Sequence, residues 1–174
     1  MPQAQAIEPV VWRGFTRPAL DAAYNNSAAV ADSADRIADW SRRSAALRAR
    51  LDRHLDLRYG PRERNRIDVF RCGRPDAPLL AFIHGGYWQR NSKEVFSCMA
   101  EGPLAHGYDV ALPGYTLAPT ASLGAIVAEI RAAIGWLRLH GPALGFARGR
   151  LIVSGWSAGG HLAATAMAWP TVDA

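Results

Sequence analysis

Short apolar runs alternate with amphipathic segments along most of the chain. Five runs rich in apolar residues are predicted to form strands, and these are Leu55–Tyr59, Ile67–Arg71, Leu79–His84, Tyr108–Pro113 and Leu151–Gly155. Helical periodicity is found at Ile37, Trp40, Leu47 and Leu51, over Ser92–His106 and Leu123–His140, and directly after Ser157. Apolar strands separated by helices indicate the α/β class, with a mostly parallel sheet covered by helices on both faces.

Two of these helices carry boundary signals. Asn91 and Glu94 have the spacing of a capping box, which predicts a helix start for Ser92–His106. The segment Leu123–His140 stops at Gly141-Pro142, a pair that commonly ends a helix.

The length and composition are those of one folded domain. The chain has 174 residues, of which 49% are hydrophobic and 20% charged, and this excludes intrinsic disorder. Cys72 and Cys98 stand alone in the sequence, so neither a disulfide framework nor a zinc site is expected. Residues 1–15 carry no export signal. Together these features predict a reduced, cytoplasmic protein.

Two stretches lack charged residues and are long enough to cross a bilayer, residues 110–128 and 151–172. Both contain proline or several glycines, so we interpret them as the buried core of a soluble protein and expect no membrane partner.

The net charge of +5 is concentrated in one region, because residues 42–74 hold eleven arginines and four acidic residues. Such a cluster can indicate an anionic partner. However, several of these arginines fall opposite the apolar stripe of a predicted helix, so a solvated helix face would explain most of the charge. No aromatic residues interleave with them and no binding motif accompanies them, so we expect no nucleic-acid partner.

The most informative motif follows the last predicted strand. Gly155-Trp156-Ser157-Ala158-Gly159 has the form G-x-S-x-G and precedes a helix-forming segment. A tight strand-to-helix turn of this kind needs small flanking residues and exposes the serine hydroxyl. Ser157 is therefore a candidate nucleophile, and the backbone N–H of Ala158 can point toward a developing oxyanion. An ordinary serine in a glycine-rich turn is the alternative.

A second motif ends the third predicted strand, His84-Gly85-Gly86-Tyr87-Trp88. Glycines lack a Cβ atom and let the main chain approach a tetrahedral intermediate, whose negative oxygen can then accept hydrogen bonds from backbone N–H groups. A plain turn is the alternative, but the two motifs in this order at two strand ends favour an acyl hydrolase.

Together the two motifs resemble those of the α/β-hydrolase superfamily, and the Tyr-Trp ending of the second resembles the kynurenine formamidase (arylformamidase) branch. The resemblance runs from about Tyr24 to the C-terminus, and further matches lie at Tyr24–Asn26, Val30, Asp32, Tyr59–Pro61, Ile67–Phe70 and Tyr115–Pro119. It implies a serine hydrolase that needs no metal or organic cofactor. The enzyme would cleave a small-molecule aryl formamide or ester through an acyl-serine intermediate.

Carried over residue by residue, the resemblance implies that Ser157 is the nucleophile and that the N–H groups of Gly86, Tyr87 and Ala158 hold the oxyanion. Five residues are expected to support the loop and the turn: His84, Gly85, Trp88, Gly155 and Gly159. Tyr87 and Trp88 would line an aromatic pocket or pack within the loop.

The sequence departs from the family pattern after the serine. In the superfamily an acid and then a histidine follow on later strands, whereas here the candidates are His161, one helical turn beyond Ser157, and Asp173 near the end. Both are expected to be structural or terminal. We therefore expect residues 1–174 to form a single incomplete α/β-hydrolase domain, with 1–54 as a helical extension, and to be inactive alone.

The strand order implied by the resemblance is 2-4-3-5, with the first strand outside. It leaves Leu151–Gly155 at an exposed edge, where a second copy could pair. Two other interpretations stay open. One is a general carboxylesterase with the same machinery, and the other is a non-catalytic remnant or interaction module of the same fold.

Overall fold

The computed structural model describes residues 8–51, 53–146 and 150–168. The chain divides into two compact units, Met1–Asp39 and Trp40–Ala174. The boundary lies within helix α2 (Ser33–Arg50), and so earlier than the end of the predicted extension 1–54.

The first unit contains a small β-hairpin as well as helix. Strand β1 (Val10–Trp12) pairs antiparallel with β2 (Phe15–Thr16), and helix α1 (Arg17–Tyr24) follows at once. The side chain of Thr16 caps this helix by accepting a hydrogen bond from the Ala19 N–H. The sequence predicted helix alone here, because strands of two and three residues leave no readable alternation of polar and apolar positions.

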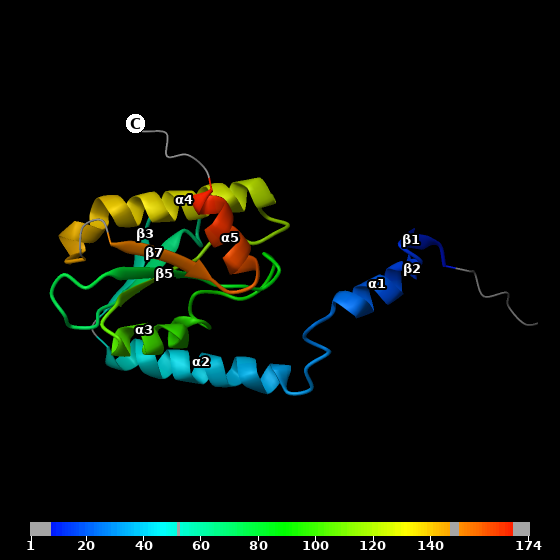
Figure 1. Cartoon of the computed structure of the whole chain (residues 1–174), viewed down its shortest axis with the longest axis horizontal. Helices are drawn as coiled ribbons and strands as arrows, with labels where there is room; N and C mark the ends of the chain where they lie inside the picture. Colours follow the sequence, from blue (N-terminus) through cyan, green and yellow to red (C-terminus); the bar gives the residue numbers. More distant parts are fainter. Residues whose placement is uncertain (1–7, 52, 147–149, 169–174) are drawn as a thin grey trace, which may run out of the picture. The chain divides into compact units, whose positions relative to one another are not determined.

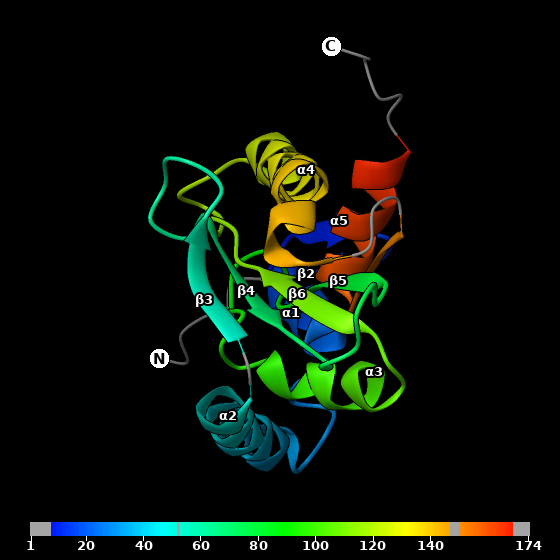
Figure 2. The ribbon, with the colours of Figure 1, turned by 90° about the vertical axis from the view of Figure 1, so that its left-hand side faces the viewer.

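The second unit is built on a five-stranded sheet with the order β3-β4-β6-β5-β7. Its strands are β3 (Arg53–Arg58), β4 (Arg66–Phe70), β5 (Leu79–Ile83), β6 (Asp109–Pro113) and β7 (Leu151–Gly155). Each lies within two residues of its predicted start, and the predicted order is confirmed. Helices α4 (Leu123–His140) and α5 (Ala158–Met167) lie on one face of the sheet, and α2 and α3 (Glu101–Ala105) lie on the other (Figures 1 and 2).

The sheet is mixed, which refines the expectation of a mostly parallel one. Strand β5 is parallel to β6 and to β7, whereas the β3–β4 and β4–β6 pairs are antiparallel. The reason lies in the connections. A short turn joins β3 to β4, and only the connections from β5 onward contain the helices that a parallel crossover requires.

The central strands β4, β5 and β6 are buried on both faces of the sheet, as their apolar runs predicted. Val69 and Ala111 face a cluster that includes helix α4, whereas Phe70 and Val110 face a cluster that includes Leu47 of α2. Residues adjacent along one strand therefore pack into clusters on opposite faces of the sheet. In β6 every residue is buried.

The predicted helix Ser92–His106 is wrong in its first half. A 3-10 turn, Ser97–Ala100, leads into the short helix α3 instead. Asn91 does not cap a helix, because its φ is +73° and its side chain donates to the Gly85 carbonyl at 3.2 Å. Glu94 accepts a hydrogen bond from Lys93 at 2.6 Å. Both ends of the capping box thus serve other partners, whereas α4 runs over Leu123–His140 as predicted.

The arginine-rich region is also used differently than expected. Buried carboxylates need a counter-charge, and Arg48 pairs with the buried Asp68 while Arg71 pairs with the buried Asp109 at 2.9 Å. Pairs with partly exposed carboxylates are Arg43–Glu101, Arg50–Glu101 and Arg62–Glu129. Much of the local charge is therefore neutralised within the fold, and a solvated helix face explains only part of it.

Among the residues that the structure describes, no helix combines the length and the apolar character that crossing a bilayer requires. The charge-free stretch 151–172 corresponds, as far as residue 168, to strand β7, the turn after it and helix α5.

Candidate active site

Ser157 sits on the turn between strand β7 and helix α5. Its backbone angles, φ +55° and ψ −119°, lie in a region that residues with a side chain rarely adopt. The residue is exposed, whereas Ala158, the first residue of the helix, is buried. The turn therefore presents one serine at the carboxyl end of β7 and beside the N-terminus of α5.

The glycine after the serine is required by a close approach of backbone. A Cβ atom at Gly159 would clash with the carbonyl oxygen of Ile83 on strand β5. The N–H of Trp156 donates to that same oxygen at 3.1 Å. The serine turn is thus fastened directly to the end of the neighbouring parallel strand.

The loop that follows β5 is tightly folded. Gly86 has a φ of +124°, and the N–H groups of Gln89 and Arg90 both donate to its carbonyl oxygen at 2.9 Å. Tyr87 and Trp88 also have positive φ angles, +52° and +58°. Strained residues of this kind persist only where the surroundings hold them, and they cluster at functional sites.

This loop and the serine turn lie against each other. A Cβ atom built on Gly85 would be 2.5 Å from the Trp156 carbonyl oxygen and 3.2 Å from the Ser157 Cβ atom. The structure therefore brings together Ser157, Ala158 and the start of the Gly85–Tyr87 segment. Only a residue without a side chain fits at position 85.

His84 lies beneath the loop. It is 1% exposed, and its ring stacks on Tyr115 at 4.3 Å and on Phe96 at 6.0 Å. Its Nδ1 atom lies 2.9 Å from the Gly85 carbonyl oxygen and donates to it. Burial lowers the pKa of His84 to about 4. The ring is therefore neutral at pH 7 and supports the loop from inside.

His161 and Trp88 contact each other across the two motifs. Their rings meet edge to face with centroids 5.3 Å apart. The backbone N–H of His161 donates to the Ser157 carbonyl at 3.2 Å. Among the described residues, no hydrogen bond joins the Ser157 hydroxyl to an imidazole or a carboxylate. Asp173 lies outside the described residues.

Two tryptophans lie at the serine turn, Trp156 within it and Trp40 in contact with Trp156, and neither was predicted to belong to the site. Trp156 is 46% exposed and packs edge-on against Trp40 of α2, with centroids 5.7 Å apart. Trp156 also contacts Phe96 at 5.5 Å. In the sequence, Trp40 was interpreted as one member of an apolar stripe, and the stripe does not show which of its residues contacts the serine turn. For Trp156, its position next to Ser157 in the motif was the signal that could have predicted a place in the site.

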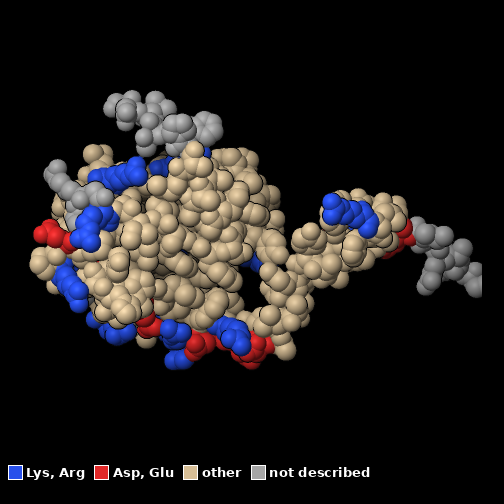
Figure 3. All heavy atoms as spheres, viewed as in Figure 1, with Lys and Arg blue, Asp and Glu red and all other residues tan. Residues whose placement is uncertain are grey.

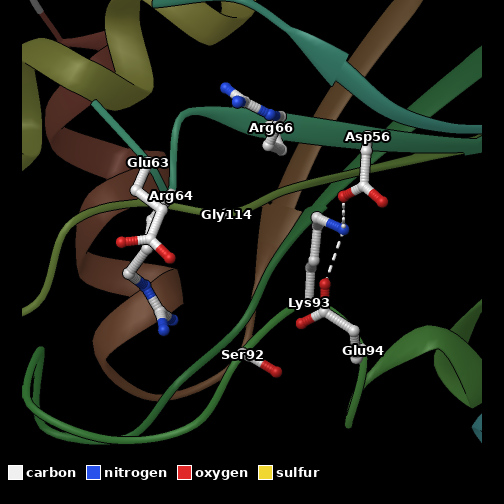
Figure 4. A pocket seen from close by; sticks show the side chains of 8 residues that line it. All are labelled: Asp56, Glu63, Arg64, Arg66, Ser92, Lys93, Glu94 and Gly114. Carbon is white, nitrogen blue, oxygen red and sulfur yellow. Dashed lines mark hydrogen bonds and ion pairs between the residues drawn. The ribbon is translucent and has the colours of Figure 1, made fainter. Parts of the chain in front are cut away.

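A separate charged cavity of about 180 Å³ lies between the β3–β4 turn and the segment after the loop (Figure 4). Lys93, the one lysine of the sequence, has its amino group 2.8 Å from both Asp56 and Asp68 and 2.6 Å from Glu94. Burial alone would lower the pKa of Lys93, but these hydrogen bonds raise it. Burial likewise would raise the pKa of Glu94, but hydrogen bonds from Lys93 and Ser92 lower it to about 2.

The comparisons with known proteins agree with the fold. The chain is 29% identical to a kynurenine formamidase of Danio rerio over 93% of its own length. A crystal structure from Silicibacter sp., assigned as a thioesterase, superposes with a TM-score of 0.77 at 33% identity over 84% of this chain. An esterase from Pyrobaculum calidifontis gives a TM-score of 0.60 at 27% identity over 74% of it.

The chain spans about half the length of these relatives, namely 57%, 54% and 44% in the same order. Residues 69–171 match the sequence profile of the BD-FAE family, which is more than half of the chain. The matched segment includes both motifs of the site. The chain therefore belongs to the BD-FAE family and is an α/β-hydrolase similar to the kynurenine formamidases.

Proposed function

We propose that this chain carries the nucleophile and the oxyanion donors of a serine hydrolase of the kynurenine formamidase type. The carrying observation is the strained, exposed Ser157 held against the backbone of Gly85. The general base and its acid partner would come from residues outside those that the structure describes. The substrate class is an aryl formamide or ester, which the similarity to a kynurenine formamidase supports.

In the proposed reaction, the Ser157 oxygen attacks the carbonyl carbon of the substrate and loses its proton to the general base. The carbonyl electron pair moves to oxygen, and this oxyanion accepts hydrogen bonds from the N–H groups of Gly86, Tyr87 and Ala158. The tetrahedral intermediate then collapses, and the amine or alcohol leaves with the proton. Water hydrolyses the acyl-serine by the same steps and restores the enzyme.

The backbone supplies most of the stabilisation in this scheme. Ala158 is the first residue of α5, whose early N–H groups have no partner within the helix, and whose dipole favours negative charge at this end. Each oxyanion donor is worth about 3 kcal/mol of transition-state stabilisation in enzymes of this kind. Because the donors are backbone groups, their placement depends on the conformation of the loop and the turn.

A fluorophosphonate probe tests the proposal, because it phosphonylates serines that are activated as nucleophiles. The protein purified with its natural termini should form one adduct, located at Ser157 by mass spectrometry and absent from a Ser157→Ala variant. Ser154→Ala is a matched control, since the Ser154 hydroxyl lies 3.5 Å from the Ala81 carbonyl on the neighbouring strand. Folded protein without an adduct at Ser157 would overturn the proposal in favour of a non-catalytic module.

A general carboxylesterase is the second candidate, and the similarity to the Pyrobaculum esterase favours it. Turnover of an aryl formamide compared with turnover of short acyl esters, each as kcat/KM, separates the two. We expect the aryl formamide to be preferred. A strong preference for the short esters would assign the site to the esterase class.

A further inference from the structure

We propose that Arg64 is a positioning residue that holds the loop Gly85–Asn91 in the conformation needed for oxyanion binding. The inference rests on the proposed function of that loop. Arg64 lies in the turn between β3 and β4, and it reaches two other segments. Its Nε atom donates to the Tyr115 carbonyl at 2.8 Å, and its Nη2 atom donates to the Asn91 carbonyl at 2.7 Å.

The two residues whose carbonyls Arg64 binds also form hydrogen bonds to the start of the loop through their side chains. Asn91, at the end of the loop, donates from its side chain to the Gly85 carbonyl at 3.2 Å. Tyr115 donates from its hydroxyl to the His84 carbonyl at 2.9 Å. Arg64 therefore binds Asn91, the last residue of the loop, directly. Through Asn91 and Tyr115 it is connected to Gly85, the first residue of the loop, and to His84, the residue before it.

The loop needs such a restraint because its own backbone is strained. Four residues of the segment have positive φ, and three of them, Tyr87, Trp88 and Asn91, are not glycine. Conformations of this kind relax unless neighbouring groups hold them. The hydrogen bonds to the Gly86 carbonyl act within the loop, whereas the guanidinium of Arg64 joins the loop to the rest of the fold.

The chemistry of the contact points to positioning rather than to charge pairing. Among the ion pairs of the described residues Arg64 has none, whereas Arg48, Arg62 and Arg71 all pair with carboxylates. A planar guanidinium can donate in two fixed directions at once, which a lysine ammonium does not reproduce. Two carbonyls on separate segments use that geometry fully.

Arg66 offers a matched control two residues away. It lines the same cavity, but its guanidinium donates to the carbonyl of its chain neighbour Asn65, at 3.3 Å, and to none of the loop carbonyls that the structure describes. In Figure 4 the Arg66 guanidinium points away from the loop side of the cavity, where Arg64 lies. Loss of either arginine removes one positive charge, but only loss of Arg64 removes the hydrogen bonds to Asn91 and Tyr115.

Amide hydrogen exchange tests the restraint without relying on catalysis. In Arg64→Ala we expect the amides of residues 85–91 to exchange at least about tenfold faster than in the wild type. The Asn91 end of the loop then loses its hydrogen bond to the fold, and the bond from the Ala118 N–H to the Trp88 carbonyl, at 2.8 Å, remains. Arg66→Ala should leave them within about twofold. Arg64→Lys keeps the charge and the apolar stem, and its loop amides should exchange as fast as those of Arg64→Ala. This variant replaces Arg64→Ala in the experiment if the alanine variant does not fold. Equal exchange in the Arg64 and Arg66 variants would overturn the proposal.

Fluorophosphonate inactivation tests the link to function. The maximal inactivation rate should fall about 100-fold in Arg64→Ala with little change in probe binding, because small displacements of aligned groups cost rates of this order. Added guanidinium should restore part of the rate in Arg64→Ala and none in Arg66→Ala. Equal inactivation rates in Arg64→Ala and Arg66→Ala would overturn the role of Arg64. A wild type as unreactive as Ser157→Ala would overturn the proposed function. In that case the hydrogen-exchange data would still test whether Arg64 restrains the loop.

Discussion

Ser157 adopts a backbone conformation that costs about 1–3 kcal/mol for a residue with a side chain. The surrounding residues hold it there by close backbone contact. The Trp156 N–H is bonded to the end of β5, and the positions of Gly85 and Gly159 have no room for a Cβ atom. The exposed position of Ser157 therefore depends on backbone contacts and not on polar side chains.

Replacement of Gly159 by alanine should be strongly destabilising. The new methyl group would clash with the Ile83 carbonyl, and the turn would have to move away from β5. We expect the free energy of unfolding, measured by urea denaturation, to fall by about 2–3 kcal/mol. Gly160→Ala is the control, because its Cβ atom would lie 3.3 Å from the nearest atom and alanine favours the helix, so stability should stay within about 1 kcal/mol. Equal losses in both variants would contradict the expected clash.

The buried imidazole of His84 should make stability depend on pH. The pKa is about 4 in the folded chain, against an ordinary value of 6.5. The unfolded chain therefore binds the proton first, and the contribution of neutral His84 is complete above pH 6.5 and is lost as the pH falls toward 4. Between pH 7 and pH 5 the free energy of unfolding should drop by about 2 kcal/mol.

A His84→Gln variant isolates this effect, because all other titrating groups are kept. Its urea midpoint should change less between pH 7 and pH 5 than that of the wild type. Glu94, whose pKa is lowered to about 2, contributes only at lower pH. The same pH dependence in both proteins would show that His84 is not the group responsible.

At the residue scale, the backbone geometry of the candidate site could be predicted from the sequence, because the two glycine-rich motifs specify it locally. The places of Arg64, Asn91 and Trp40 could not. Arg64 lay in an arginine-rich stretch where nothing distinguished it from its neighbours, and its two carbonyl partners come from segments far along the chain. Contacts of that kind depend on how strands pair rather than on local pattern.

At the scale of elements, the agreement follows the strength of the local signal. Helix α4 has an apolar stripe, a capping serine and a Gly-Pro stop, and its bounds were predicted to the residue. The segment 92–100 had a capping signal as well. However, the Asn91 side chain donates a hydrogen bond to the Gly85 carbonyl, and the Lys93 side chain donates to Asp68 of strand β4. Long-range polar contacts here override a local preference for helix.

Lys93 joins several elements through its buried ammonium. The β-bulge in β3 places Asp56 opposite it, Asp68 comes from β4, and Lys93 itself follows the loop after β5. Its side chain is only 5% exposed, so its loss leaves Asp68 underpaired in the interior. The ion pair thus fixes the position at which the loop rejoins the fold.

Lys93→Met should lower the free energy of unfolding by about 3 kcal/mol, the lower end of the usual cost of breaking a buried ion pair, because Asp68 keeps its pair with Arg48. Arg50→Met is the comparison, because Arg50 is 61% exposed and lies 3.5 Å from Glu101. That variant should lose less than about 0.5 kcal/mol. Chemical denaturation of both variants at one pH is the measurement, and losses of similar size would show that the Lys93 pairs contribute no more than a surface pair.

At the scale of the whole second unit, one edge of the sheet is open. Among the described strands β7 pairs only with β5, and Ile152 in its centre is 46% exposed. Figure 3 shows a broad area over β7 and α5 without charged side chains. Apolar edges of this kind can pair with another strand, so we expect the 174-residue chain to self-associate.

A charge on the edge should suppress that association. Ile152→Lys is expected to shift the chain toward monomer in size-exclusion chromatography with light scattering, because a lysine opposes strand addition. Leu139→Lys is the control, since Leu139 is 75% exposed but lies on helix α4. A wild type that stays monomeric when concentrated, or an equal response to both substitutions, would argue against pairing through β7.

The parallel pairing of β5 with β7 has a kinetic consequence. Ile83 lies opposite Gly155 in that ladder, and the loop and the turn meet just beyond this pair. Neither motif can assemble the site by local folding, because their junction exists only after a slow, non-local contact has closed. A reagent that reacts at Ser157 would therefore report, during refolding, the moment at which β7 pairs with β5.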